Sequence, residues 1–235
     1  MSLRSTAVLI GIVTLSAAVC ARLGLWQLDR LQERQATNAA AMARRALPPV
    51  LLNTTSEHPL VDRRVSARGT FDHAHQVVLR GRVYRESPGV YVVTPLRLDG
   101  SDSAVLVNRG FVPAPDALTV SLDTLDEPGG REVTGIAQPI PASADSGTPL
   151  VRGGHTTWKR LDLAALRARL PYPMLDIVII ETPDSDSTGF PRRLEPQPLD
   201  NGPHLSYAIQ WFAFGTIALV GGAFLVAHER RRIRD

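Results

Sequence analysis

His204 is the residue of this chain with the clearest potential for chemistry, because it stands where a long uncharged apolar run begins. One helix face would carry, at positions i, i+3, i+4 and i+7, His204, Tyr207, Ala208 and Trp211. A helix N-terminus disfavours the imidazolium cation, and the neutral imidazole is the form that binds iron. The small Ala208 between aromatic residues could accommodate a flat apolar macrocycle, so the pattern is compatible with haem ligation. Alternatively, His204 is an interfacial anchor of the helix, since polar and aromatic residues gather at that depth.

Other motifs that carry chemistry are few. His73 and His75 would present two imidazoles on one strand face, which could bind copper; the alternative is two surface histidines at a strand edge. The chain has no glycine-rich phosphate loop, no Gly-x-Ser-x-Gly elbow and no His-Glu-x-x-His motif. Its single cysteine, Cys20, excludes a cysteine zinc site and an intramolecular disulfide. We therefore expect no enzyme, because an anchored enzyme would need a nucleophile–base pair that these spacings do not offer.

The composition is that of a folded chain with two apolar ends. Of 235 residues, 44% are apolar, which excludes a disordered chain. The 26 basic and 23 acidic residues are evenly mixed, so we expect no nucleic-acid partner. Apolar residues crowd into both ends, whereas the middle is polar and punctuated by proline.

Both apolar ends predict membrane spans. The run Leu205–Ala227 holds 23 residues without a charge, enough to cross a hydrocarbon core of about 30 Å. The first run, Ala7–Ala21, is shorter, but it reaches Trp26 if the Arg22 side chain extends to the interface. Two antiparallel spans would place Trp26 and Gln27 at the same depth as His204.

The arginine-rich end of the chain predicts the topology. Short basic flanks stay in the cytoplasm, so the C-terminus and, with two spans, the N-terminus should be cytoplasmic, in a cell inner membrane. A cleaved signal peptide ending near Cys20 is the alternative for the first run. The predicted divisions are a cytoplasmic N-terminus, a first span, an extracytoplasmic domain, a second span and a cytoplasmic tail: 1–6, 7–28, 29–203, 204–227 and 228–235.

The middle of the chain predicts an α+β domain that is mostly antiparallel β, as an open sheet or partial barrel. The expected strands are Val65–Phe71, Gln76–Leu79, Val90–Leu98, Ala104–Val112, Glu132–Gln138 and Asp176–Glu181. The expected helices are Leu28–Arg45 and Leu161–Leu170, with Asp162 near the start of the second. We expect residues 142–157 to form a loop and residues 182–203 an extended return to the membrane.

Five segments in order resemble the Surfeit locus protein 1 family of cytochrome c oxidase assembly factors. The match spans nearly the whole chain. The segments that carry it are Gly24–Arg30, with its Gly-x-Trp-Gln-x-x-Arg pattern, Gly69-Thr70-Phe71, Gly89–Leu96, which ends Thr-Pro-Leu, Val107-Asn108-Arg109-Gly110-Phe111-Val112-Pro113, and His204–Phe212.

The resemblance implies a role in inserting haem a into subunit I of haem-copper oxidase. It implies that His204 is the axial ligand of the haem iron, and that partners are oxidase subunit I, haem a synthase and membrane lipid. Trp26, Tyr207 and Trp211 would surround the haem, although Trp26 is equally an interfacial anchor. The alternative is a scaffold that stabilises oxidase intermediates without binding haem.

Two further expectations follow for the residues that carry the resemblance. Arg109 would pair with a haem propionate or a partner carboxylate, or else form an internal ion pair that shapes the domain. Gly110 would mark a bulge or a close backbone approach. Gln27 and Arg30 would tie the first helix to the domain.

Overall fold

The chain forms two compact units, one helical and one rich in strands. The computed structural model describes residues 3–53, 59–143, 149–152, 155–184, 189–196 and 198–232. The helical unit comprises Met1–Ala40 and Leu199–Asp235, and the strand unit comprises Ala41–Pro198. The first boundary between the two units lies between Ala40 and Ala41, inside a helix that runs without a break from Leu3 to Ala46.

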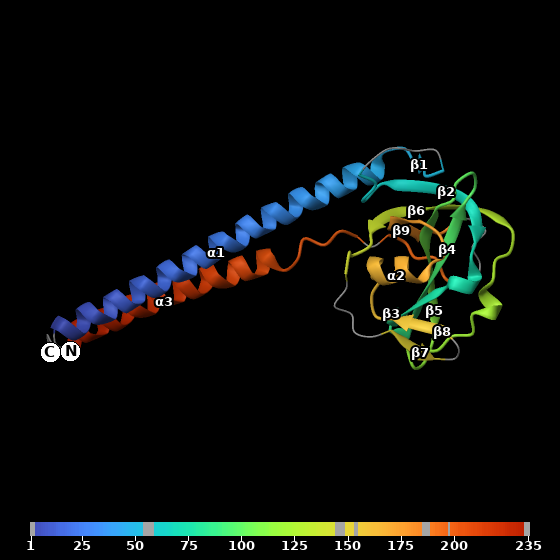
Figure 1. Cartoon of the computed structure of the whole chain (residues 1–235). Coiled ribbons are helices and arrows are strands. Elements are labelled where there is room, and N and C mark those ends of the chain that lie inside the picture. The colour runs from blue at the N-terminus through green and yellow to red at the C-terminus, as the bar shows by residue number, and fades with distance from the viewer. Residues whose placement is uncertain are drawn as a thin grey trace. The chain divides into compact units, whose positions relative to one another are not determined.

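The helical unit is an antiparallel pair, α1 (Leu3–Ala46) and α3 (His204–Arg232), with both chain ends at one end of the pair (Figure 1). Both helices are long and apolar enough to cross a membrane. The predicted helix Leu28–Arg45 is confirmed, but as a continuation of the first apolar run. The helix stops at Ala46 because Pro48 and Pro49 follow.

Glycines let the two helices approach closely. A Cβ on Gly222 would lie 2.8 Å from the Val13 side chain, and one on Gly215 would lie 3.3 Å from the Cβ of Cys20. On the other helix, a Cβ on Gly24 would lie 2.6 Å from the Phe212 ring. Small residues at such contacts are the usual way in which helices pack inside a membrane, where apolar burial supplies no drive.

The strand unit closes into a barrel. Its described residues form nine strands: β1 (Val50–Leu51), β2 (Arg64–Phe71), β3 (Val77–Tyr84), β4 (Ser87–Leu98), β5 (Ala104–Pro113), β6 (Gly130–Pro139), β7 (Leu150–Arg152), β8 (His155–Trp158) and β9 (Met174–Glu181). The order β2-β6-β9-β5-β4 returns to β2 and closes the ring. Among the described strands, only β1–β2, β3–β8 and β5–β9 pair in parallel, so the predicted mostly antiparallel domain is confirmed.

The barrel encloses one apolar core. Every strand of the ring contributes side chains to it, among them Val65, Leu96, Val107, Val133 and Ile179, which are all inaccessible to solvent. Each such aliphatic side chain contributes about 1.5–3 kcal/mol when it leaves water. Alternation along β2 places Val65 and Ala67 inside and Arg64 and Arg68 outside, which is the pattern that the sequence displayed.

A second core lies under the short helix α2 (Leu163–Arg169). Leu166 of α2 packs against Leu106 of β5 and Val178 of β9 on the outer face of the sheet. The predicted helix start is confirmed, because the Asp162 side chain accepts a hydrogen bond of 2.9 Å from the Ala165 amide.

The structure corrects two expectations about local structure. Residues His73–His75 form a 3₁₀ turn, η1, rather than a strand, so the two imidazoles do not share a strand face. The Nδ1 atom of His75 lies 2.8 Å from Asp72 and that of His73 lies 3.1 Å from Asp126. The expected loop 142–157 contains β7 and part of β8, with 144–148 and 153–154 outside the described residues. A second 3₁₀ turn, η2 (Asp123–Leu125), follows β5.

Candidate functional site

His204, the first residue of α3, contacts Gln27 in the middle of α1. The Nδ1 atom of His204 lies 2.8 Å from Oε1 of Gln27. Because an amide oxygen only accepts, the imidazole donates from Nδ1, and Nε2 carries the lone pair. Among the described residues, no hydrogen-bond partner faces Nε2. Gln27 and His204 therefore lie at the same level of the helix pair, as predicted, and the depth of that level in a membrane stays a prediction.

A tight turn positions His204 at the first residue of α3. Gly202 has φ +71°, a left-handed conformation that favours glycine, and its amide donates to the Asp200 side chain at 3.0 Å. A Cβ on Gly202 would lie 3.4 Å from Nε2 of His204. The glycine thus leaves room beside the nitrogen that is available to a metal.

Two residues of α1 fasten this turn. The Asn38 amide donates to the Asp200 carbonyl at 3.1 Å and to the Asn201 side chain at 2.9 Å, and Nε of Arg34 donates to the Asp200 carbonyl at 3.2 Å. The sequence analysis missed these residues. The sequence Asp-Asn-Gly-Pro before an apolar run does signal a tight turn, but no sequence signal points from it to Asn38.

The aromatic residues at this end of the helices are mostly exposed. Trp26 is 42% exposed and Tyr207 is 46% exposed, and Trp211 is half-buried with its ring edge-on to Phe214. Arg30, which was expected to tie α1 to the domain, instead pairs with Glu33 at 2.6 Å and covers the Trp26 ring.

Ala208 does not provide the expected space for a flat macrocycle. It is 1% exposed and follows His204 by one turn, on the same face as Gly215 and Gly222, which contact α1. The neighbouring helix therefore occupies the space beside Ala208. Any flat ligand of His204 must lie against the exposed aromatic side of the pair instead.

Arg109 belongs to the barrel unit, where its guanidinium is fully buried. A register shift between β4 and β5 makes Arg109 a bulge residue, and a bulge redirects a side chain. The guanidinium donates to Glu127 at 2.9 Å, to Gln76 at 3.2 Å and to the Leu125 carbonyl. The internal ion pair, one of two expected roles, is therefore present in the structure; pairing with a propionate stays a prediction.

Glu127 is the hub of this buried network. Its carboxylate also receives Arg193 at 2.7 Å and Arg131 at 2.7 Å, and Arg193 lies 3.1 Å from Glu181. Burial works to raise the pKa of Glu127, but the hydrogen bonds and charges of Arg109 and Arg193 outweigh it and lower the pKa. Burial raises the pKa of Glu181, and Arg193 only partly opposes that rise. Sequence spacing gave no signal for these two acids.

Gly110 confirms the expected close approach. It has φ +118°, and a Cβ there would collide with the Arg192 carbonyl. The backbones of Phe111 and Arg192 exchange two hydrogen bonds at this point, of 2.8 Å and 2.9 Å. The Asn-Arg-Gly segment thus joins β5 to the returning chain and at the same time buries the arginine.

Comparison with known proteins identifies the family. The profile of the SURF1 family matches residues 14–216. The chain belongs to the SURF1 family. A SURF1-like protein of Monosiga brevicollis is 30% identical over 221 residues, which cover 86% of this chain and 82% of that protein. A SURF1-like protein of Rickettsia bellii is 26% identical over 213 residues, 88% of this chain and 86% of that protein. Surfeit locus protein 1 of Arabidopsis thaliana is 36% identical over 115 residues, 42% of this chain and 32% of that protein.

In this SURF1 family chain, two segments that are distant in sequence meet in space. Gly24 receives the Phe212 ring, and Gln27 holds the His204 ring. Both contacts join the segment Gly24–Arg30 to the segment His204–Phe212. The glycine at position 24 leaves room for the Phe212 ring, and the glutamine at position 27 orients the imidazole at the start of α3.

Proposed function

We propose that this protein is a two-span membrane protein that binds haem a through His204 and assists its insertion into subunit I of a haem-copper oxidase. The observation that carries the proposal is the oriented imidazole, with Nδ1 held by Gln27 and Nε2 left for a ligand. The oxidase role rests on the resemblance to the Surfeit locus protein 1 family, and the SURF1 family match and a relative named Surfeit locus protein 1 support that resemblance. Partners would be oxidase subunit I and haem a synthase.

The residues at this site fit an iron porphyrin. Haem iron, when bound, accepts an imidazole nitrogen as its axial ligand. A neutral histidine whose other nitrogen is hydrogen-bonded is the usual form of such a ligand. Gly202 keeps the nitrogen accessible, and the exposed rings of Trp26 and Tyr207 offer apolar surface. His204 would hold a bound haem by one imidazole, which would grip it less firmly than two histidines and would suit a carrier that must release its cargo.

We further propose that both chain ends are cytoplasmic and that the barrel lies outside the cytoplasm, in a cell inner membrane. The exposed Arg230 and Arg231 at the end of α3 support this orientation. A signal peptide cleaved near Cys20 is disfavoured, because it would remove Val13 and Ala17, which α3 contacts through Gly222 and Gly215. Cysteine labelling from either side of the membrane tests this topology.

The haem proposal is tested by purifying the full chain from cells that make haem a and recording its visible spectrum. We expect His204→Ala to lose most of the bound haem. The matched control is His228→Ala, the same substitution near the other end of α3, which should keep it. Gln27→Leu removes the acceptor for Nδ1, and a lost second partner commonly costs about 10–100-fold in metal affinity. Equal haem content in all variants would remove His204 from the mechanism.

A scaffold that binds no haem makes the opposite prediction. It would support oxidase assembly normally with His204→Ala and fail when contacts of the barrel are changed. Assembly is read as oxidase haem content in cells that carry each variant. Normal assembly with His204→Ala would favour the scaffold and overturn the haem carrier.

A further inference from the structure

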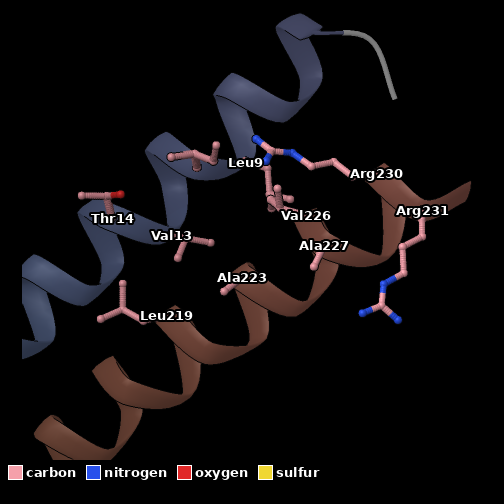
Figure 2. A pocket seen from close by; sticks show the side chains of 11 residues that line it. Leu9, Val13, Thr14, Leu219, Ala223, Val226, Ala227, Arg230 and Arg231 are labelled. Atoms are coloured by element: carbon pink, nitrogen blue, oxygen red, sulfur yellow. The ribbon is translucent and has the colours of Figure 1, made fainter. Parts of the chain in front are cut away.

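The two helices leave a groove between them at the end where the chain begins and ends. Figure 2 shows this groove, which has a volume of about 550 Å³. Val13 of α1 and Ala223 and Val226 of α3 form part of its apolar lining. The volume falls within the range of about 300–1,000 Å³ that is typical of ligand sites.

Small side chains on α3 are the reason for this groove. Gly222 brings α3 close to Val13, and the residues that follow toward the end, Ala223 and Ala227, carry only a methyl group. They do not fill the space opposite Leu9. Because the walls are apolar and lie within both membrane-crossing helices, the occupant must itself be apolar.

Two arginines lie at the mouth of the groove, at the end of α3. Arg230 and Arg231 line it and are both exposed. Figure 2 shows that the Arg230 side chain reaches toward α1 near Leu9, whereas Arg231 points the other way. In the part of the chain that the structure describes, neither guanidinium has a carboxylate partner. The site thus combines an apolar channel with unpaired positive charge at its mouth.

We propose that this groove binds one anionic phospholipid, with an acyl chain along the helix pair and the phosphate at Arg230, the guanidinium that reaches toward α1, while Arg231 adds positive charge nearby. Guanidinium groups bind phosphate oxygens in bidentate fashion. Basic pockets between membrane helices on the cytoplasmic side are typical sites for anionic headgroups. The inference goes beyond haem handling and rests only on the part of the proposed function that places both helices in a membrane.

The test is native mass spectrometry of the full chain, released from nanodiscs with equal amounts of phosphatidylglycerol and phosphatidylcholine. We expect one retained lipid per chain, predominantly phosphatidylglycerol. Arg230→Gln with Arg231→Gln should reduce that preference by about tenfold, because each arginine near an anionic surface adds a substantial attraction. Arg232 and Arg234 remain in this variant, so the basic flank that sets the orientation is kept.

Two further variants separate charge from shape. Arg44→Gln with Arg167→Gln removes the same charge from exposed sites outside the groove and should leave the preference unchanged. Ala223→Phe fills the groove without changing charge and should reduce the retention of both lipids. Equal retention of the two lipids by the wild type, unchanged retention in Ala223→Phe, or a dimer in place of the lipid adduct would each overturn the proposal.

The outcome is independent of haem. Loss of haem with His204→Ala together with unselective lipid retention would overturn the lipid site and leave the haem carrier standing. Failure of the chain to co-float with vesicles would overturn the membrane placement itself, and with it both proposals.

Discussion

Two polar sites in this molecule differ in how completely their nitrogen atoms are hydrogen-bonded within the chain. At the helix end, His204 pairs with Gln27 and keeps one ring nitrogen without a described partner. In the barrel, Arg109 is fully buried and directs its guanidinium to Glu127, Gln76 and a carbonyl. Under the proposed function the first arrangement orients a ring nitrogen for a ligand, whereas the second uses its polar groups inside the fold.

The difference shows that a motif that carries the family resemblance need not be a binding site. Asn108-Arg109-Gly110 and His204–Phe212 both carry the family resemblance. Exposure distinguishes them, since Arg109 has none and the residues around His204 keep exposed rings. A buried ion pair adds little net stability over apolar residues, yet removing one partner leaves an uncompensated charge. Substitutions in the barrel network should therefore lower the free energy of unfolding strongly. Substitutions at His204 or Gln27 should lower it little and, under the proposed function, should lower haem binding.

The largest effect is expected for Glu127→Gln. It leaves three arginines around a neutral amide, and breaking a buried pair typically costs about 3–5 kcal/mol. The free energy of unfolding of the full chain in detergent measures it. The control is Glu132→Gln, which breaks an exposed pair with Arg68 and should cost about 0–1 kcal/mol. Equal costs would mean that the buried network is not special.

A somewhat smaller effect is expected for Gly110→Ala. Both Gly110 and Gly100 have positive φ, so alanine is strained at each, by about 1–3 kcal/mol. Only at Gly110 would the new Cβ collide with a neighbouring carbonyl, because nothing lies within 4 Å at Gly100. Thermal unfolding should therefore rank Gly110→Ala as the less stable variant, and the reverse order would contradict the close approach.

Next comes the packing of the helix pair. Gly215→Val should cost about 1–3 kcal/mol through overpacking, since the Ala17 carbonyl lies 3.6 Å from a Cβ at this position. Gly221→Val is the matched control on the same helix, with nothing within 4 Å. Thermal unfolding of the full chain in detergent ranks the two variants. Equal losses in both would contradict the described contact face.

The smallest effect is a pH dependence that differs between two acids of one network. The pKa of Glu127 is lowered, so its stabilisation is present above its ordinary value of 4.5 and is lost as the pH falls through the folded value. The pKa of Glu181 is raised, so its contribution is greatest in acid and is lost as the pH rises. Relative to the wild type, Glu181→Gln should therefore be more favourable at pH 7 than at pH 4, and Glu127→Gln the opposite. Parallel profiles would contradict the assignment.

Local sequence determined much of the fold of this protein. Alternation along Arg64–Phe71 identified a strand, the uncharged apolar run after His204 identified a helix, and Asp162 identified a helix start. These features are local, because side-chain period and capping depend on a few neighbouring residues. The common level of Gln27 and His204 also followed, since the sequence predicted two antiparallel helices with these residues at the same end of the two apolar runs.

Only the tertiary structure decided what those residues face. Closure of the barrel depends on β2 pairing with both β4 and β6. The acid that pairs with Arg109, Glu127, lies 18 residues away in a segment whose sequence gives no sign of the pairing. The strand predicted at His73–His75 was wrong, because the chain turns there between β2 and β3. The space predicted beside Ala208 was also wrong, because Ala208 is buried on the face that packs against α1. Sequence thus set element type and order, whereas exposure, ion pairing and ring closure depend on long-range packing that no local pattern encodes.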